Sequence, residues 1–247
     1  MRTKLTIAYV GTAYSGWQRQ ANAPTVQAAL EDAAAAVAGM PTRVHGAGRT
    51  DAGVHAQGQV AHFDADKARD AATWQRAINA GLDSDIRVIA AMPVSDDFHA
   101  RHSARGKTYR YALEGGAIQS PFSARYAWHV GADLDIRALQ AGAEQLLGPL
   151  DQRAFATQPE DGGRPDRPLD SVSVQPTPRG IDIVFVGRSF LRHAVRAMVG
   201  TLVEVGRGQR GAESVRGVAA SGDRTLAGAT APAHGLCLEA VHYDDQA

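Results

Sequence analysis

The stretch Gly46-Ala-Gly-Arg-Thr-Asp-Ala-Gly-Val-His55 places one carboxylate, Asp51, among three glycines, with Arg49 two residues before it. Glycine lets the backbone adopt positive φ and approach a ligand closely, at a cost in folding entropy. An acid in such a segment is exposed, fixed in direction and close to a cation. This arrangement suits a carboxylate that must touch a substrate. The alternative is that Asp51 only closes a turn, because Asp and Gly are also among the commonest turn residues.

On both sides of this stretch, hydrophobic periodicity predicts regular elements. The spacing predicts a helix that begins after Thr25, which can cap it, and ends at Gly39 and Pro41. Strands are expected over 5–9, 59–63 and 86–92, and a second helix over 73–80. The order β-α-β-α-β predicts an α+β fold, with helices packed on one face of a mainly antiparallel sheet.

The rest of the chain repeats this composition. We expect strands over 108–113, 172–174, 181–186 and 236–241, a helical stripe over 136–147, a long loop over 153–169 and a helix beginning at Phe190. In the loop, Phe155, Arg164 and Arg167 either reach a ligand or are simply solvated. A division near residue 104 predicts two similar α/β halves, 1–104 and 105–247, with a basic central cleft.

Composition limits the class of protein. The chain has 247 residues and 44% hydrophobic content, enough to fill a core. The single cysteine, Cys237, excludes an internal disulfide and a Cys-rich zinc site, which favours a reducing, cytoplasmic setting. No N-terminal apolar run resembles a signal peptide, and no stretch approaches the ~20 apolar residues that span a bilayer. We therefore expect a soluble protein with no membrane partner.

The charges are balanced in number and uneven in distribution. Lys plus Arg and Asp plus Glu are 26 each, so the whole chain is neutral. Residues 99–113 carry Arg101, Arg105, Lys107 and Arg110 without an acid, and residues 188–210 carry five arginines against one glutamate. Two such segments favour a local phosphate-binding cleft. The alternative is a pair of solvated basic faces.

An early segment, Gly11-Thr-Ala-Tyr-Ser-Gly-Trp-Gln-Arg-Gln20, has two glycines five residues apart. The Lys-Ser/Thr pair of a nucleoside triphosphate loop is replaced by Trp17-Gln18, so a triphosphate site is not expected. Tyr14, Trp17 and Arg19 instead suit stacking on bases and contacts to phosphate. Trp17 serves equally well as a core residue.

A second dense segment runs from Asp97 to Tyr111. If its end forms a strand, Tyr109 and Tyr111 share one face and Arg110 points to the other. Paired tyrosines on a strand usually pack in a core or across strands. Position alone therefore does not assign either tyrosine to a site.

Taken together, these segments resemble the motifs of the tRNA pseudouridine synthase A family. The resemblance rests on Gly48-Arg-Thr-Asp-Ala-Gly-Val-His55, the early 11–20 loop, Phe98 to Tyr109 and the stretch 189–200, and it covers nearly the whole chain. It implies that Asp51 is the catalytic aspartate, Tyr109 the active-site tyrosine and Arg196 the arginine that pairs with the aspartate. Ala194 stands where the family usually has methionine, which concerns local packing only.

The resemblance also implies an activity. Members convert uridine to pseudouridine in the tRNA anticodon stem-loop, at tRNA positions 38, 39 and 40, as homodimers. The isomerisation conserves atoms, so no cofactor or metal is expected. The residues expected to contact RNA are Arg19, Arg49, Phe98, His99, Arg101, His102, Arg105, Lys107 and His193. Whether Asp51 adds to C6, attacks C1′ or starts deprotonation at C2′ stays open.

Two other functions compete with this one. The first is a non-catalytic RNA-binding module that uses the same basic residues. The second is a metallohydrolase that uses some of the nine histidines. His99 and His102 lack an evident third ligand, and no His-Glu-x-x-His pair is present, so the sequence argues against the second.

Overall fold

A computed structural model of the chain describes residues 1–65, 69–131, 134–157 and 167–244. The chain divides into two compact units, one made of residues 1–105 with 237–247 and the other of residues 106–236. The C-terminal segment thus belongs to the first unit. The organisation into two similar halves stays a prediction.

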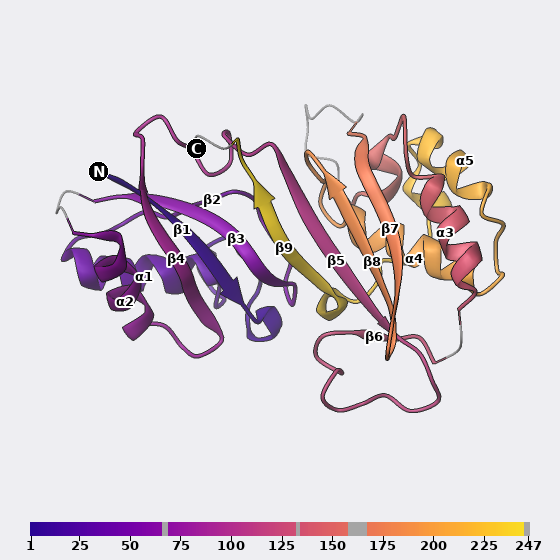
Figure 1. Ribbon diagram of the computed structural model, residues 1–247, viewed down its shortest axis with the longest axis horizontal. Helices are drawn as coiled ribbons and strands as arrows, with labels where there is room; N and C mark the ends of the chain where they lie inside the picture. The colour runs from indigo at the N-terminus through magenta and orange to yellow at the C-terminus, as the bar shows by residue number, and fades with distance from the viewer. Residues whose placement is uncertain (66–68, 132–133, 158–166, 245–247) are drawn as a thin grey trace. The chain divides into compact units, whose positions relative to one another are not determined.

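The first unit contains a mostly antiparallel group of strands (Figure 1). Strand β1 (Arg2–Tyr9) pairs antiparallel with β3 (His55–Asp64) on one side and with β4 (Ile86–Val94) on the other. The short β2 (His45–Gly46) pairs antiparallel with β3, and β9 (Leu236–His242) pairs with β3 in parallel. The predicted strands are confirmed and are longer than expected.

Helix α1 (Val26–Ala38) begins and ends where the sequence predicts, and α2 (Ala71–Ala80) ends as predicted and begins two residues earlier. Helix α1 starts at Thr25, whose side chain accepts the N–H of Ala28, and it ends at Gly39 with φ of 75°. Helix α2 packs against α1 and β4. The predicted β-α-β-α-β order is confirmed, with β2 added before β3.

The core of the first unit forms on the helix-facing side of the strands. Residues along β1 alternate between half-buried and buried, as expected for a strand covered on one face. Phe63 on β3 and Trp74 on α2 are fully buried and meet edge to face at 4.9 Å. Burial of side chains of this size contributes roughly 1.5–3 kcal/mol each. This packing holds β3 in place, and the segment that carries Asp51 leads into β3.

The second unit repeats the antiparallel arrangement. Strand β5 (Gly106–Glu114) pairs antiparallel with β8 (Gly180–Gly187), which pairs antiparallel with β7 (Leu169–Thr177). The short β6 (Trp128–His129) pairs with β5 in parallel. The strands predicted for this half are confirmed. Along β5, Tyr109, Tyr111 and Leu113 are buried and alternate with half-buried residues, as predicted.

The helices of the second unit correct the sequence analysis at two ends. Helix α3 (Ile136–Glu144) ends three residues before the end of the stripe predicted over 136–147. Helix α4 (Ala194–Gly206) begins at Ala194 instead of Phe190, because His193 has φ of 65° and cannot continue a right-handed helix. Arg192 therefore precedes the helix that carries Arg196, and the two are not neighbours on one helical surface. Helix α5 (Ser214–Ser221) completes the unit.

The predicted loop over 153–169 is partly wrong. Its start forms a turn of 3₁₀ helix, η2 (Gln152–Phe155), in which Phe155 is fully buried, so Phe155 is a core residue. Arg164 lies outside the described residues. Three further 3₁₀ turns are η1 (Gly11–Ala13), η3 (Arg224–Leu226) and η4 (Ala233–Gly235).

The molecule is thus a mixed α/β protein. Its strands are mostly antiparallel, and the described residues contain five α-helices. Within those residues, no helix has the length and apolar character needed to cross a membrane.

Candidate functional site

Asp51 lies in the segment between β2 and β3 of the first unit. The residue is half-buried, between exposed neighbours Arg49 and Ala52 and the buried Thr50. The backbone turns just after it, with Gly53 at φ of 79° and the Val54 N–H donating to the Asp51 carbonyl at 3.1 Å. The turn expected from composition is therefore present, and the same turn presents Asp51 at the surface.

The 11–17 loop packs directly against this segment. A Cβ added to Gly16, which has φ of 93°, would lie 2.6 Å from the Thr50 carbonyl oxygen. The Trp17 N–H donates to that oxygen at 3.1 Å, and the Gly53 N–H donates to the Tyr14 carbonyl at 3.3 Å. The glycines of both segments thus permit close backbone contact, and two hydrogen bonds hold the loops together.

Trp17 was assigned by the sequence to either the core or RNA. Its side chain is 2% exposed, lies 6.2 Å from the Tyr9 ring and covers Gly46, where an added Cβ would be 2.6 Å from the indole. Burial of this extent leaves no ring face for a base. Trp17 is therefore a core residue beneath the Asp51 loop.

Arg19 is exposed and contacts two acids of α1. Its guanidinium pairs with Glu31, with Nε 2.6 Å from the carboxylate, and with Asp32. Both acids raise the pKa of Arg19, with Asp32 the larger cause. A phosphate contact by Arg19 would have to compete with these two ion pairs.

Four histidines gather at the other end of β3. His45 and His62 are directly opposite each other on β2 and β3, and their rings stack at 5.0 Å. The His99 ring lies 4.7 Å from His62, and the His102 ring lies 4.3 Å from His99. We call His45, His62, His99 and His102 the histidine cluster. Only His99 and His102 were singled out from the sequence.

Hydrogen bonds fix which nitrogens of two of these rings carry a proton. The Ala100 N–H donates to Nδ1 of His62 at 3.1 Å, and the Arg101 N–H donates to Nδ1 of His99 at 3.1 Å. Each ring must therefore keep its proton on Nε2 while it is neutral. The cluster is organised around neutral imidazoles.

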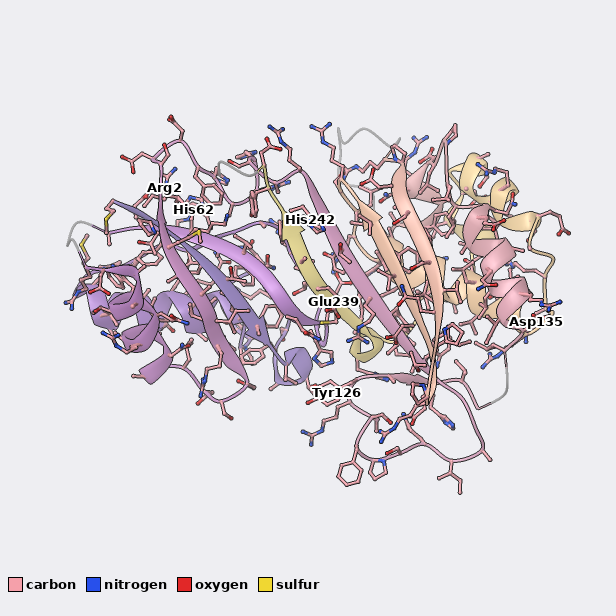
Figure 2. The ribbon with its side chains drawn as sticks, viewed as in Figure 1. Arg2, His62, Tyr126, Asp135, Glu239 and His242 are labelled. Atoms are coloured by element: carbon pink, nitrogen blue, oxygen red, sulfur yellow. The ribbon has the colours of Figure 1, made fainter. Side chains whose placement is uncertain are left out.

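Electrostatics favour the same state. Burial lowers the pKa of His62 to about 4, and the charges of His99 and Arg2 act in the same direction. Figure 2 shows Arg2 and His62 close together in the first unit. Burial is also the largest cause that lowers the pKa of His99 and of His45.

Phe98 lies beneath the cluster and is only 4% exposed. Its ring meets Tyr243 at 5.2 Å and His62 edge to face at 6.0 Å, and the Lys4 ammonium lies 5.0 Å from its centre. A ring this buried offers almost no surface to RNA. We assign Phe98 to packing, in place of the RNA contact expected from the sequence.

The basic residues after the cluster differ in exposure. Arg101 and Arg105 are exposed, whereas Lys107 on β5 is half-buried. Arg105 pairs with Asp244 at 2.8 Å, and its N–H donates to the His242 carbonyl, which anchors the end of the segment to the C-terminal residues. Arg101 and His102 are the exposed members of this stretch that remain suited to bind phosphate.

In the second unit, the predicted tyrosine lies on β5. Tyr109 is 7% exposed, and its ring meets Phe190 edge to face at 5.1 Å. Tyr111, two residues along, is fully buried and donates its hydroxyl to the Pro232 carbonyl at 2.8 Å. Burial raises the pKa of Tyr111, and the charge of Arg196 opposes that rise. Tyr111 is a core residue, as the sequence suggested.

Arg196 lies in the first turn of α4. Its Nε donates to the Ala231 carbonyl at 2.8 Å, and the Ala231 N–H donates back to the Arg196 carbonyl at 3.1 Å. His193 caps this helix with φ of 65°, a conformation that is costly for a residue with a Cβ. The second unit thus carries Tyr109 on β5, Arg196 in the first turn of α4 and His193 immediately before that helix.

Comparison with known proteins decides the family. The model of a family described as tRNA pseudouridine synthase matches residues 5–103 and 143–244. The chain belongs to the tRNA pseudouridine synthase A family. This family consists of isomerases that convert uridine to pseudouridine in tRNA.

Similar proteins extend over the whole length. The tRNA pseudouridine synthase A of Methylobacterium sp. (strain 4-46) is 45% identical over 245 residues, which cover 99% of this chain and 98% of that protein. The one from Syntrophotalea carbinolica is 44% identical, over 98% and 96% of the two chains. The one from Myxococcus xanthus is 42% identical, over 99% and 92%.

Within the described residues, no group of three or more His, Cys, Asp or Glu side chains could hold a metal ion. The histidine cluster lies within these residues. Its rings stack on one another, and backbone N–H groups occupy two of its nitrogens, so they do not converge on a point.

Sequence analysis missed several residues around Asp51. Tyr9, at the end of β1, contacts the Thr50 hydroxyl at 2.8 Å, and the buried Gln59 on β3 donates to the Gly48 carbonyl at 3.1 Å. His55 accepts the Gly11 N–H at 3.0 Å. Each contact joins a strand residue to a residue outside the strands that is at least 11 positions away, so local spacing carries no signal for it. Gln59 alone gave a hint, as a polar residue inside an apolar strand.

Proposed function

We propose that this protein isomerises uridine to pseudouridine in the anticodon stem-loop of tRNA, at tRNA positions 38, 39 and 40, with Asp51 as the catalytic carboxylate. The observation that supports it most is the Asp51 loop itself. A half-buried aspartate stands on a turn locked by glycine contacts and backbone hydrogen bonds, inside the region matched by the family.

The reaction needs little chemistry from the protein. The N1–C1′ bond of uridine breaks, the base rotates and C5 bonds to C1′, while the proton at C5 leaves and N1 gains one. Asp51 adds to C6, attacks C1′ or starts deprotonation at C2′. In each path a carboxylate works in its ionised form, so it must be kept charged beside a stacked base.

In the proposal, the positive charge of Arg196 keeps Asp51 ionised. Desolvation by a base raises the pKa of a carboxylate, and a cation within about 4–6 Å lowers it. Asp51 belongs to the first unit, whereas Tyr109 and Arg196 belong to the second. The proposed reaction therefore uses residues of both units, with Tyr109 against the uracil. Tyr109 lies on β5, and Arg196 lies in the first turn of α4.

In the proposal, exposed basic side chains bind the phosphates of the RNA. RNA helices are recognised mainly by shape, 2′-hydroxyls and phosphates, and everting a base costs a few kcal/mol that phosphate contacts must offset. Arg49, Arg101 and His102 are exposed in the first unit and suit this role. The half-buried Lys107 and His193 are secondary candidates. The proposal includes a homodimer, in which one tRNA contacts both copies.

Asp51→Asn tests the catalytic assignment directly. We expect pseudouridine formation, measured as tritium release from tRNA that carries 5-tritiated uridine, to fall at least about 10³-fold, since removal of an essential catalytic group costs on that order. Binding of tRNA, measured by filter retention, should persist. Asp83→Asn is the matched control, because Asp83 is an exposed loop acid of the same unit. Undiminished tritium release by Asp51→Asn would contradict the proposal.

The same assay tests Arg196. Arg196→Met should cost activity heavily, and Arg137→Met, at an exposed arginine of α3, should not. An unpaired carboxylate in a desolvated site is expensive, so a lower affinity for tRNA is also expected. Unchanged turnover by Arg196→Met would exclude it as the partner of Asp51.

Two measurements test the finer statements. Mapping of pseudouridine in bulk tRNA after incubation identifies the modified positions, and modification outside 38–40 would contradict the stem-loop assignment. Light scattering after size exclusion measures the mass of the particle, and a monomer of 26.1 kDa would contradict the dimer. If tRNA binds and no uridine changes, the protein is a binding module instead of an enzyme.

A further inference from the structure

We propose that Tyr9 and Gln59 are positioning residues, which hold the Asp51 loop in its working geometry through buried hydrogen bonds to Thr50 and Gly48. This inference rests on the proposed catalytic role of Asp51. All the contacts lie within the first unit, and neither side chain has surface with which to reach a substrate: Tyr9 is 3% exposed and Gln59 is 0% exposed.

Tyr9 ends β1 beneath the loop. Its hydroxyl oxygen lies 2.8 Å from Thr50 Oγ1, the side chain immediately before Asp51. The ring packs against Trp17, whose N–H donates to the Thr50 carbonyl at 3.1 Å. Thr50 is therefore held at its side chain by the Tyr9 hydroxyl and at its carbonyl by the backbone of Trp17.

Gln59 holds the loop from β3. Its Nε2 donates to the Gly48 carbonyl at 3.1 Å, and its Oε1 accepts the Val60 N–H at 3.1 Å. These two backbone partners fix which end of the amide is nitrogen, because a carbonyl can only accept and an N–H can only donate. The amide also bonds the Tyr9 side chain, so one group links Gly48 to Tyr9.

The Tyr9 hydroxyl stays protonated in this network, and either it or the Thr50 hydroxyl can donate the hydrogen bond between them. Burial raises the pKa of Tyr9 far above neutrality, which keeps that proton in place. The contacts to Gly48 and Thr50 anchor the two residues on either side of Arg49, just before Asp51.

The far side of Asp51 is anchored as well. The Val54 N–H bonds the Asp51 carbonyl, and the Gly53 N–H bonds the Tyr14 carbonyl. Asp51 thus stands between two fixed ends, and its own half-exposed side chain takes its direction from them. A displacement of about 1 Å at a reacting group can cost on the order of 10²-fold in rate. Loss of the Tyr9 hydroxyl should therefore appear in turnover before it appears in substrate binding.

The experiment measures kcat and KM for pseudouridine formation in Tyr9→Phe, Thr50→Val and Gln59→Leu of the full chain, with Tm recorded for each. We expect kcat to fall about 10- to 100-fold while KM changes less than about two-fold. Thr50→Ser keeps the hydroxyl and should recover activity to within about three-fold of wild type. The double variant Tyr9→Phe/Thr50→Val should lose no more than either single variant, because both remove one contact.

The matched control is Tyr243→Phe. Tyr243 is a half-buried tyrosine of the first unit, and its hydroxyl donates to the Ala100 carbonyl at 2.7 Å, in the histidine-cluster region. It should lose Tm much as Tyr9→Phe does and keep kcat within about two-fold. If kcat in Tyr9→Phe matches Tyr243→Phe, or if Thr50→Ser is as slow as Thr50→Val, the positioning role is overturned.

Different outcomes test this inference and the proposed function on which it rests. An inactive wild-type protein, or an active Asp51→Asn, overturns the proposed function. An active wild type with an inactive Asp51→Asn and a fully active Tyr9→Phe overturns only the positioning role. If Tyr9→Phe fails to fold, the comparison of Thr50→Ser with Thr50→Val decides the question alone.

Discussion

Two segments of the first unit hold most of its candidate residues, and different forces fix them. The Asp51 loop is fixed by shape: glycines let two backbones touch, and hydrogen bonds join them. The histidine cluster, with Phe98 beneath it, is fixed by ring packing that requires uncharged imidazoles. Both segments flank β3, one at each end.

The contrast explains what each segment should tolerate. Close backbone contact leaves no room for a Cβ, and the groups that make it do not titrate near neutral pH. Stacked imidazoles accept changes in backbone neighbours more easily, and they are sensitive to protons. An added methyl group should therefore disrupt the conformation of the Asp51 loop, and acidification should destabilise the packing of the histidine cluster.

The largest effect is expected from Gly16→Ala. The new methyl would lie 2.6 Å from the Thr50 carbonyl oxygen, on a backbone with φ of 93°. Strain and overlap together should lower the free energy of unfolding by about 2–4 kcal/mol and disable the Asp51 loop. Urea unfolding measures the first effect, and tritium release measures the second.

Gly116→Ala provides the control for this change. Gly116 has a similar φ of 86°, but nothing lies within 4 Å of an added Cβ. It therefore reports backbone strain alone, about 1 kcal/mol. If Gly16→Ala is no more harmful than Gly116→Ala, close contact does not fix the loop.

The elements of the fold could be predicted from the sequence because their signals are local. Thr25 and Gly39 bound α1 as caps, and the alternation along β5 placed Tyr109 and Tyr111 on one buried face. The start of α4 was wrong for a reason that periodicity cannot reveal. The apolar stripe continues back to Phe190, but the left-handed conformation of His193 makes the helix begin four residues later, at Ala194.

The candidate site could be predicted only in part. Asp51 and its glycines are contiguous in sequence, so their role in a turn followed from composition, whereas Asp51 is half-buried where exposure was expected. The residues that hold the loop come from strands, Tyr9 at the end of β1 and Gln59 in the middle of β3, and pairing register alone brings them there. The same reason explains why His45 and His62 were missed while His99 was not.

Acidification should weaken the histidine cluster. The pKa of His62 is lowered from 6.5 to about 4 in the folded protein, so between these values the unfolded chain binds a proton that the folded protein refuses. The contribution of His62 to stability is complete above pH 6.5 and is lost as the pH falls towards 4. We expect a loss on the order of 2 kcal/mol, measured by urea unfolding across this range.

His62→Gln sharpens this test, because glutamine can accept the Ala100 N–H without titrating. The variant should start less stable and lose less on acidification than wild type. His242→Gln, at an exposed histidine of the same unit, should follow the wild-type curve. Identical pH dependence in wild type and His62→Gln would mean that this ring does not limit stability in acid.

The smallest effect on stability is expected from Arg2→Lys, at the arginine of β1 that supports the histidine cluster. Arg2 bonds both oxygens of Asp64, at 2.8 and 2.9 Å, and its Nη1 donates to the carbonyls of Phe98, at 2.7 Å, and Asp96. Lysine cannot make this forked contact, so Arg2→Lys should lower stability by about 1 kcal/mol at neutral pH. Arg76→Lys on the exposed face of α2 is the control. Since Arg2 also depresses the pKa of His62, and a lysine keeps that charge, the acid sensitivity of Arg2→Lys should stay near wild type. A variant that loses stability at pH 7 and keeps the wild-type slope towards pH 4 would separate the packing role of Arg2 from its charge.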